Sequence, residues 1–536
     1  MLVKQLDLPA IQPFASAYIK ESTQAMKHFH YSYKGDFKRR LADLDQRTFL
    51  RDELFSCIEK FMDGLPSSEQ TKSSLTALKE DAVAVVGGQQ AGLLTGPLYS
   101  IHKVISIIKL AEQQTDELGR KVIPIFWIAG EDHDFLEINH VYTESDGKLK
   151  KKGYPERVIT KKMASDIQYD QAEMRHWIDE ILTEFGETNH TAALREKLYQ
   201  AAAENENITK MFAWLVMDLF KDSGLIVLDA ADPDLRRLES AFFKQLIEQH
   251  EEINRAVLAQ QEVLKNDGFK PMIELEHDAA NLFIRVDEER QLLFYKGGAF
   301  YDKAGRAYSL SELMNEAEHH PENLSNNVVT RPLMQEWLIP TLAFIGGPGE
   351  IAYWAELKSG FEKAGFYMPP VVPRLTYSIV ERNIEQDTKE LDLSIDRVIA
   401  EGVQKERSAF WDQVKDQSLK SLIEETENQL KKQYRHIKEL SDKYDPNFNQ
   451  IVEKNLGFHL KQLSYLQMKS DDALKLKHDN ILRKYDRVEN ALRPAGGPQE
   501  RMWNIYYYLN RYGDTFIKDL LHAEVEFNHK HNIIHV

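Results

Sequence analysis

Cysteine is nearly absent from this sequence, since Cys57 is the only one among 536 residues. A single thiol excludes an intrachain disulfide and is typical of proteins from a reducing compartment, so we predict a cytoplasmic location. Cys57 lies in the apolar helical pattern LFSCIEKFM. That setting favours a buried structural thiol over a nucleophile.

Long apolar runs are also missing. No stretch approaches the roughly 20 apolar residues that a membrane-spanning helix needs. The first residues, MLVKQLDLPAIQPF, lack the apolar core and small-residue cleavage site of a secretory signal. We therefore expect no membrane association and no export.

Positive charge is in deficit, with 68 lysines and arginines against 85 acids and a net charge of −17. Such a balance disfavours nucleic-acid binding. The basic run GKLKKKG, residues 147–153, is most simply a solvated turn or hairpin. What the chain does have is 42% hydrophobic residues over a length sufficient for two or three domains.

The first informative stretch is a predicted strand, glycine-rich turn and helix. AVAVVGG (82–88) reads as a buried strand, GQQAGLLTG carries Gly88, Gly92 and Gly96, and Pro97 suits the first position of a helix. Free amides at a helix start and glycines that admit a close ligand together predict a nucleotide or other anion here. The stretch is neither GxGxxG nor a P-loop, and many such turns have no ligand.

Three polar side chains follow on one face of this helix: Tyr99, His102 and Lys103. They are candidates for contacts to a bound anion. His102 also borders the apolar stripe of the helix, and on the helix alone a packed, hydrogen-bonded histidine is the favoured interpretation.

A second junction is FWIAGEDHDF, residues 126–135, where a continuous apolar strand ends in an acidic cluster. Ligands of open α/β sheets bind outside the carboxyl ends of the strands, so this cluster and the glycine-rich turn should face one crevice. Two chemistries remain open. Asp132, His133, Asp134, Glu137 and His140 could bind a metal, or the acids could recognise an amine and move protons. The second is preferred because the histidines lack zinc-site spacing.

A third junction, FIGGPGEIAYW (344–354), repeats the device of strand, glycines and helix. Its glycines Gly346 and Gly347, with Glu350 and Tyr353, are expected to reach the same crevice. The segment MPPVVPRLTYSIV (368–380) predicts a strand that completes the sheet, and its Arg374 is a candidate for phosphate or carboxylate recognition.

From residue 384 the chain becomes highly charged and poor in glycine. Seven-residue spacings predict two long antiparallel helices with a heptad seam and a turn at KYDPNF. The spaced residues are Ile423, Leu430, Ile437 and Tyr444 in the first helix and Leu474, Ile481 and Val488 in the second. These two helices would form an arm that requires no catalytic residues and offers a surface for dimerisation.

The three junction motifs together resemble the bacillithiol biosynthesis cysteine-adding family, BshC, over nearly the whole chain. The resemblance implies a Rossmann-like parallel-sheet core of the class I nucleotidyl-transfer type, with inserted connecting segments and a coiled-coil arm. It divides the chain into a core with a helical preface at 1–383, the arm at 384–490 and C-terminal helices at 491–536 that pack back on the core. The connecting segments would lie at about 140–210 and 268–335, where the pattern turns polar or alternating.

The class I signature TGxLHIGH can be compared with TGPLYSIH, residues 95–102. Thr95, Gly96, Leu98 and His102 match, Tyr99 replaces the first histidine, and Ile101 replaces a glycine. The resemblance therefore carries His102 over as a phosphate-contacting residue. No KMSKS loop is present in the sequence.

The activity implied by the resemblance is ligation of cysteine to the amine of glucosaminyl malate, with ATP as activating cosubstrate, cysteinyl adenylate as intermediate, and no tightly bound cofactor or metal. A homodimer through the coiled coil is expected. The candidate catalytic residues are His102, Asp132, His133 and Asp134. The candidate substrate-binding residues are Gln89, Tyr99, Glu131, Gly346, Gly347, Glu350, Tyr353 and Arg374. The candidate nucleotide-binding residues are Gly88, Gln90, Gly92, Thr95, Gly96 and Lys103.

Two other functions remain open on the sequence: a metal-dependent hydrolase that uses the EDHD cluster, and a nucleotide-regulated scaffold in which the arm is the functional part. The sequence does not decide whether ATP is cleaved to AMP or to ADP.

Overall fold

The computed structural model describes residues 1–145, 147–155, 162–415, 417–441 and 447–536. These residues form two compact units. The first comprises 1–145, 149–379 and 499–536, and the second comprises 146–148 and 380–498. Within the described residues no helix is long and apolar enough to cross a membrane.

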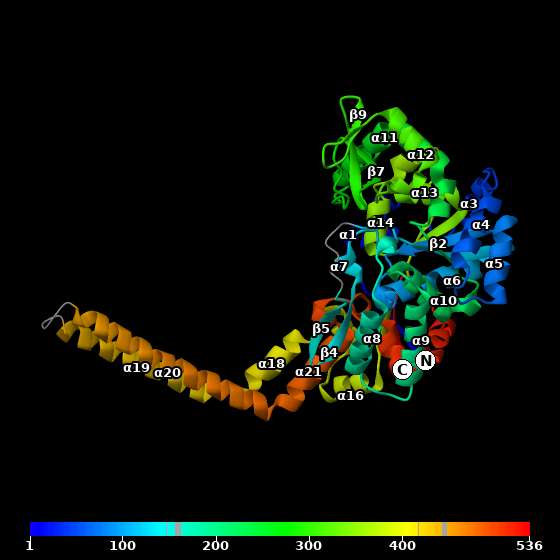
Figure 1. The fold of residues 1–536 in the computed structure, drawn as a ribbon. Coiled ribbons are helices and arrows are strands. Elements are labelled where there is room, and N and C mark those ends of the chain that lie inside the picture. Colours follow the sequence, from blue (N-terminus) through cyan, green and yellow to red (C-terminus); the bar gives the residue numbers. More distant parts are fainter. Residues whose placement is uncertain (146, 156–161, 416, 442–446) are drawn as a thin grey trace. The chain divides into compact units, whose positions relative to one another are not determined.

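The centre of the first unit is a parallel sheet in the order β13-β12-β2-β3-β6. Figure 1 labels its middle strand, β2. Its strands are β2 (Val83–Gln89), β3 (Val122–Ile128), β6 (Ile226–Asp229), β12 (Thr341–Gly346) and β13 (Val371–Pro373). All residues of β3, β6 and β12 are buried. Continuous burial explains the unbroken apolar runs of the sequence, because a parallel sheet is covered on both faces.

The helix after the glycine-rich turn is α6 (Leu98–Leu118), which packs on β2, β3 and β12. Pro97 is its N-cap, with φ −65° and ψ 159°, rather than the first helical residue predicted. The helix ends at Gly119, which takes the left-handed conformation common at helix C-termini.

The other helices of the first unit fall into two groups, before and after β2 in the sequence. Those before β2 are α1 (Pro13–Ile19), α2 (Thr23–Met26), α3 (Phe37–Leu44), α4 (Arg51–Met62) and α5 (Glu69–Lys79). Those that follow are α7 (Phe135–Ile138), α8 (Gln171–Phe185), α9 (Thr191–Glu204), α10 (Ile208–Phe220), α11 (Pro233–Asn266), α12 (Leu310–His319), α13 (Thr330–Leu338), α14 (Pro348–Trp354), α15 (Lys358–Lys363), α22 (Ile505–Tyr512) and α23 (Thr515–His522).

Three smaller sheets complete the unit. An antiparallel sheet is formed by β7 (Ala279–Val286), β8 (Glu289–Lys296), β9 (Ala299–Tyr301), β10 (Ala307–Tyr308) and β11 (Leu324–Asn326). The pair β4 (His140–Ser145) and β5 (Lys148–Gly153) contains the basic run. A third sheet joins β1 (Leu2–Leu6), β15 (His531–His535) and β14 (Tyr377–Val380), so strands from both ends of the chain pair directly.

The prediction of one strand over 368–380 is wrong. The segment forms two short strands, and only β13 joins the parallel sheet, whereas β14 joins the sheet of β1 and β15. Pro373 ends β13, since proline lacks the amide that a longer ladder would need. Arg374 and Leu375 therefore lie in the connection between two sheets.

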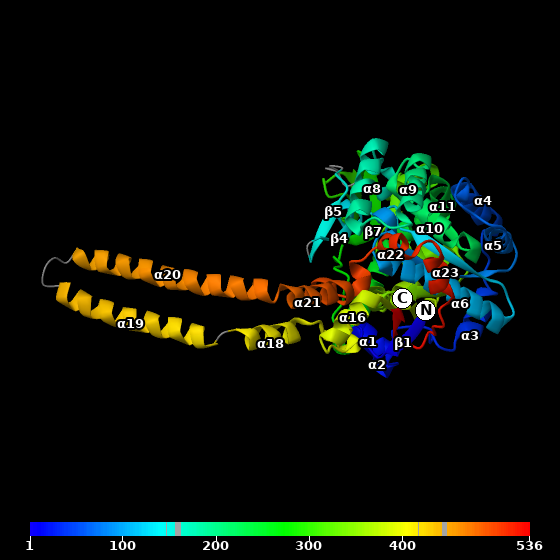
Figure 2. The same ribbon diagram turned by 90° about the horizontal axis from the view of Figure 1, so that it is seen from below.

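The second unit is mainly helical over its described residues. It contains α16 (Arg382–Glu390), α17 (Ile395–Glu401), α18 (Gln404–Val414), α19 (Gln417–Ser441), α20 (Phe448–Lys477) and α21 (Asp479–Leu492). Figure 2 shows α19 and α20 lying side by side along their length. Ser441 Oγ donates to Asn449 Oδ1 at 2.6 Å near their shared end.

The predicted seam needs correction in its second half. The helix that was predicted to carry Leu474, Ile481 and Val488 is interrupted at His478, which separates α20 from α21. Of these two helices, α20 pairs with α19, while α21 packs on α16 and α17. Tyr444 and most of the predicted turn lie outside the described residues.

Candidate functional site

The three junctions share one edge of the parallel sheet. Strands β12, β2 and β3 are neighbours and parallel, with Phe344 opposite Val86 and Gln89 opposite Ile128. Their carboxyl ends therefore lie side by side, as the sequence predicted. The glycine-rich turn after β2 lies between the other two junctions.

The glycine-rich turn is tightly folded. A Cβ added to Gly92 would lie 2.7 Å from the Cα of Gly96, so backbone would have to move to admit a side chain. Leu94, Thr95 and Gly96 all have positive φ, at 48°, 66° and 70°. All three are buried. The turn thus has a conformation that its own sequence does not favour.

Lys103 links the first junction to the third. Its ammonium donates to the carbonyl of Gly88 at 2.7 Å and to Glu350 Oε2 at 2.5 Å, and it lies 3.4 Å from Gln89 Oε1. Glu350 Oε2 also accepts the amide of Gly347 at 2.8 Å. Burial lowers the pKa of Lys103, and the Glu350 carboxylate opposes that shift. Lys103 is 1% exposed, and its ammonium connects the two glycine turns through these hydrogen bonds.

Gln90 links the first junction to the second. Its side-chain amide donates to Asp132 Oδ2 at 2.6 Å and to Glu137 Oε2 at 3.1 Å. Asp132 Oδ1 accepts the amide of His133 at 2.7 Å, which folds the acidic loop back on itself. Asp134 is exposed at the start of α7.

The acidic loop is also tied to the antiparallel sheet by a buried arginine. Arg290 Nη1 lies 3.4 Å from His133 Nδ1, and its Nε donates to Ser325 Oγ at 2.8 Å. Its guanidinium lies over the ring of Phe283 at 4.0 Å. Burial lowers the pKa of Arg290, while Glu131 and Asp132 oppose the shift. Arg290 could not be selected from the sequence, since it lies in a strand with ordinary alternation.

Glu131 is directed into the core rather than towards a ligand. It is 4% exposed and forms an ion pair with Arg236, which also contacts Glu239 at 3.0 Å. One guanidinium thus contacts two buried carboxyl groups. Burial raises the pKa of Glu239 to about 8, although Arg236 opposes the shift. The geometry gives Glu131 a structural contact beneath the acidic loop.

His102 and Arg374 meet at a carboxylate from the C-terminal segment. Arg374 donates to both oxygens of Glu500, at 2.9 and 2.7 Å, and His102 Nδ1 donates to Glu500 Oε2 at 3.0 Å. Burial would raise the pKa of Glu500, but Arg374 and His102 hold it well below its usual range. Burial lowers the pKa of His102. His102, the predicted phosphate contact, and Arg374, the predicted contact to phosphate or carboxylate, are therefore both engaged with a carboxylate of the chain itself.

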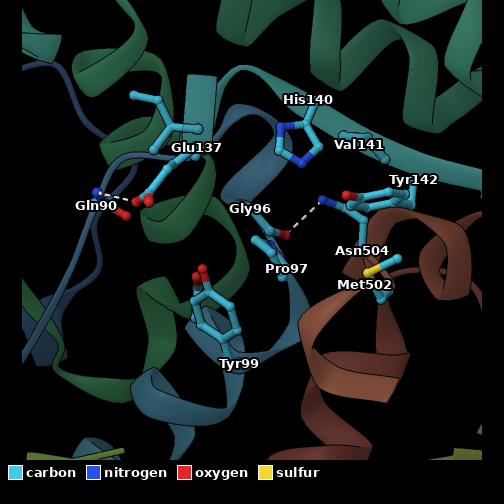
Figure 3. Close-up of a pocket in the computed structure, with 13 residues that line it drawn as sticks. Gln90, Gly96, Pro97, Tyr99, Glu137, His140, Val141, Tyr142, Met502 and Asn504 are labelled. Carbon is cyan, nitrogen blue, oxygen red and sulfur yellow. Dashed lines mark hydrogen bonds between the residues drawn. The ribbon is translucent and has the colours of Figure 1, made fainter. Parts of the chain in front are cut away.

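A pocket opens beside the glycine-rich turn (Figure 3). Its walls are Gln90, Gly92, Gly96, Pro97, Tyr99, Ser100, Glu137, Ile138, His140, Val141, Tyr142, Met502 and Asn504. Figure 3 shows Gln90 and Glu137 together on one side, and Tyr142, Met502 and Asn504 together on the other. Aromatic and apolar walls with a few amide and carboxylate groups are typical of a small-molecule site.

The structure distributes the predicted site residues between this pocket and its surroundings. Gln90, Gly92, Gly96 and Tyr99 line the pocket, whereas His133 and Gly347 are not among its lining residues. The three junctions thus share an edge of the sheet without all lining this pocket. Tyr353 lies with its hydroxyl 3.5 Å from Arg331 Nη2, beside the third junction. Gly346 ends β12 there, and buried Thr95 lies in the turn.

The pocket also contains residues that the sequence analysis missed. Tyr142, Met502 and Asn504 were not selected, because the first looked like part of an insertion and the other two like a domain junction. His140 had been considered only as a possible metal ligand. Metal binding by the acidic loop was a rival interpretation. Among the described residues, no group of three or more His, Cys, Asp or Glu side chains is arranged to hold a metal ion.

Comparison with known families agrees with this arrangement. The family profile "Bacillithiol biosynthesis BshC, N-terminal Rossmann-like domain" matches residues 1–375, and "Bacillithiol biosynthesis BshC, C-terminal coiled-coil domain" matches residues 377–536. The chain belongs to the BshC family. The predicted fold class, a Rossmann-like core with a coiled-coil domain, is thereby confirmed.

Relatives of similar length share the whole chain. A protein of Geobacillus kaustophilus is 42% identical over 542 residues, one of Bacillus cytotoxicus 40% over 537, and one of Bacillus cereus 39% over 537, with 100% of both chains covered each time. Each is named "Putative cysteine ligase BshC". As a BshC member, the chain is a ligase of bacillithiol biosynthesis.

Proposed function

We propose that this ligase joins the carboxylate of cysteine to the amine of glucosaminyl malate in the cytoplasm, with ATP as the activating cosubstrate. Amide formation in water is unfavourable at neutral pH, so a coupled nucleotide cleavage supplies the driving force. The observation that carries the proposal is the glycine-rich turn at the sheet edge, tied by Gln90 to the acidic loop and by Lys103 to the third junction.

The pocket has a cavity volume of only about 20 Å³, so a nucleoside would have to widen it, but the chemistry of its residues suits one. Tyr99, Tyr142 and Met502 offer flat and apolar surface for a base, while Gln90 and Ser100 offer polar groups. When bound, ATP would supply the leaving group of the activation step. Gln90, Gly92, Thr95 and Gly96 belong to the turn that would hold it, with Gly88 in β2 and Lys103 on α6 next to this turn.

An anion site at a helix start needs backbone amides that make no other hydrogen bond, but two amides in the turn and at the start of α6 already donate to carbonyls. Leu98 N donates to Trp503 O at 2.8 Å, and Gly96 N donates to Leu93 O at 2.9 Å. His102 is not among the pocket residues. We therefore assign His102 and Arg374 to holding the C-terminal segment against α6 through Glu500, and Lys103 to holding the two glycine turns together.

The acidic loop is the proposed site of amine recognition and proton removal. Asp132 and Asp134 retain solvent contact, and His133 is oriented by Arg290. A partly exposed carboxylate next to an imidazole can accept the proton that the attacking amine loses. Glu350 and Tyr353 would shape the opposite wall, with Gln89, Gly346 and Gly347 beside them.

Incubation of the purified chain with cysteine, glucosaminyl malate and ATP tests this function. Mass spectrometry should detect the amide-linked thiol product, and AMP would indicate adenylation of cysteine whereas ADP would indicate an acyl phosphate. Asp132→Asn should lower turnover by about 100-fold or more if the loop removes the proton. Glu262→Gln, an exposed change on α11, is the control. A product formed equally well by the Asp132 variant would refute the assigned role.

We also propose a homodimer through the second unit. On α20, Ile451, Phe458 and Tyr465 are 61%, 54% and 54% exposed and are spaced by seven residues. Such spacing places them on one face of the helix, where a second copy of the arm would cover them.

A further inference from the structure

The glycine-rich turn contains the most strained backbone beside the pocket. Leu94 has φ 48° and ψ 45°, Thr95 has φ 66°, and Gly96 has φ 70°. Positive φ is uncommon for leucine and a clear outlier for a β-branched threonine. Such residues persist only where their surroundings hold them in place.

One side chain from the far end of the sequence meets this turn. Asn504 Nδ2 donates to the carbonyl of Leu94 at 2.7 Å and to that of Gly96 at 2.8 Å. The two carbonyls flank Thr95, so the carboxamide spans the strained residues. Asn504 is 2% exposed, and the carbonyl of the preceding Trp503 accepts the amide of Leu98.

Asn504 has a second, separable role. Its Oδ1 accepts the amide of Tyr506 at 2.8 Å, which caps the N-terminus of α22. Aspartate and serine cap helices as well as asparagine does. Neither can donate the two hydrogen bonds to the turn, because a carboxylate has no proton there and a serine side chain is too short.

We propose that Asn504 is a positioning residue for the ligation reaction. Its carboxamide holds Leu94, Thr95 and Gly96 in the left-handed conformation that sets Gly92, Gly96 and Tyr99 around the pocket. The part of this inference that concerns turnover rests on the proposed function. The part that concerns the turn is independent of it.

The test compares Asn504→Asp and Asn504→Ser with Asn207→Asp and Asn207→Ser. Asn207 is a matched control for the capping role, because its side chain caps α10, a helix that also packs on Leu93–Thr95, by accepting the amide of Lys210 at 2.8 Å. Hydrogen–deuterium exchange of the peptide covering 92–100 should accelerate by at least about tenfold in the Asn504 variants, since two hydrogen bonds are lost. The Asn207 variants should leave this peptide unchanged.

Kinetics separates positioning from simple destabilisation. In Asn504→Ser, kcat should fall by at least about tenfold while KM for the amine substrate stays within about twofold, because the acidic loop is untouched. Unchanged exchange at 92–100 would overturn the proposal, and faster exchange with unchanged kcat would overturn its link to turnover. An inactive wild-type chain would count against the proposed function alone, since the exchange result would still decide whether Asn504 holds the turn.

Native-state exchange of the unaltered chain covers the case in which both variants fail to fold. The amides of Leu98 and Tyr506 should then open together, because Trp503 and Asn504 protect them from the same segment. Independent opening would overturn the proposal.

Discussion

The Lys103–Glu350 pair offers a quantitative test of how the sheet edge is held together. Lys103→Met removes the ammonium and keeps the length of the side chain. It leaves the Glu350 carboxylate, 22% exposed, with the Gly347 amide as its hydrogen-bond donor among the described residues. Breaking a buried ion pair costs about 3–5 kcal/mol, and the remaining exposure of Glu350 places the expected loss near about 3 kcal/mol.

Glu350→Gln is the second arm of a double-mutant cycle, and the expected coupling between the two changes is about 2 kcal/mol. Urea unfolding followed by tryptophan fluorescence measures it, because every tryptophan except Trp411 lies in the first unit. The matched control is Lys265 with Glu262, whose side chains are 52% and 67% exposed. That pair should couple by less than about 0.5 kcal/mol.

A coupling energy near zero would refute the described ion pair. If the two single changes add to within about 0.5 kcal/mol of the double change, the ammonium and the carboxylate do not interact as described. The tie between the two glycine turns would then be absent.

Two further predictions concern a buried acid and the arm. Folded Glu239 keeps its proton up to about pH 8, whereas an unfolded glutamate loses it near its ordinary pKa of 4.5. The folded first unit therefore binds the extra proton between these two pH values. Its free energy of unfolding should fall as the pH rises from one to the other, by up to about 1.4 kcal/mol per pH unit. Glu239→Gln should flatten this dependence of stability on pH in urea titrations from pH 5 to 8, and the control Glu262→Gln should not. An equal slope in the unaltered chain and both variants would contradict the inferred protonation. In the arm, Phe458→Glu with Tyr465→Glu should convert a dimer to a monomer in sedimentation velocity. Ser464→Glu, about 100° around the helix from Tyr465, should not; a monomeric unaltered chain would refute the dimer.

Local pattern explains which parts of the fold could be predicted from the sequence. The strand and helix around the glycine-rich turn were predictable because a buried parallel strand and a long helix have distinct apolar spacings. The acidic loop was predictable for the same reason, since it follows the strand directly. The seam beyond His478 was not, because seven-residue spacing continues across the break between α20 and α21.

The contacts that complete the site could not be predicted in this way. Glu500 and Asn504 lie in a short segment with no periodicity, and their partners His102 and Leu94 are about 400 residues earlier in the sequence, with Arg374 126 residues before Glu500. Arg290 stands in a strand whose pattern is ordinary. Polar contacts over such separations depend on the tertiary arrangement, which no local spacing encodes.

The return of the C-terminal segment to the glycine-rich turn has a consequence for biogenesis. The wall formed by Met502 and Asn504 reaches the pocket only after the helical arm has been synthesised. A ribosome-bound chain can therefore form the parallel sheet and still lack a finished binding site. Closure of so long a loop is an intrinsically late step, so newly made molecules should acquire activity after they acquire most of their secondary structure.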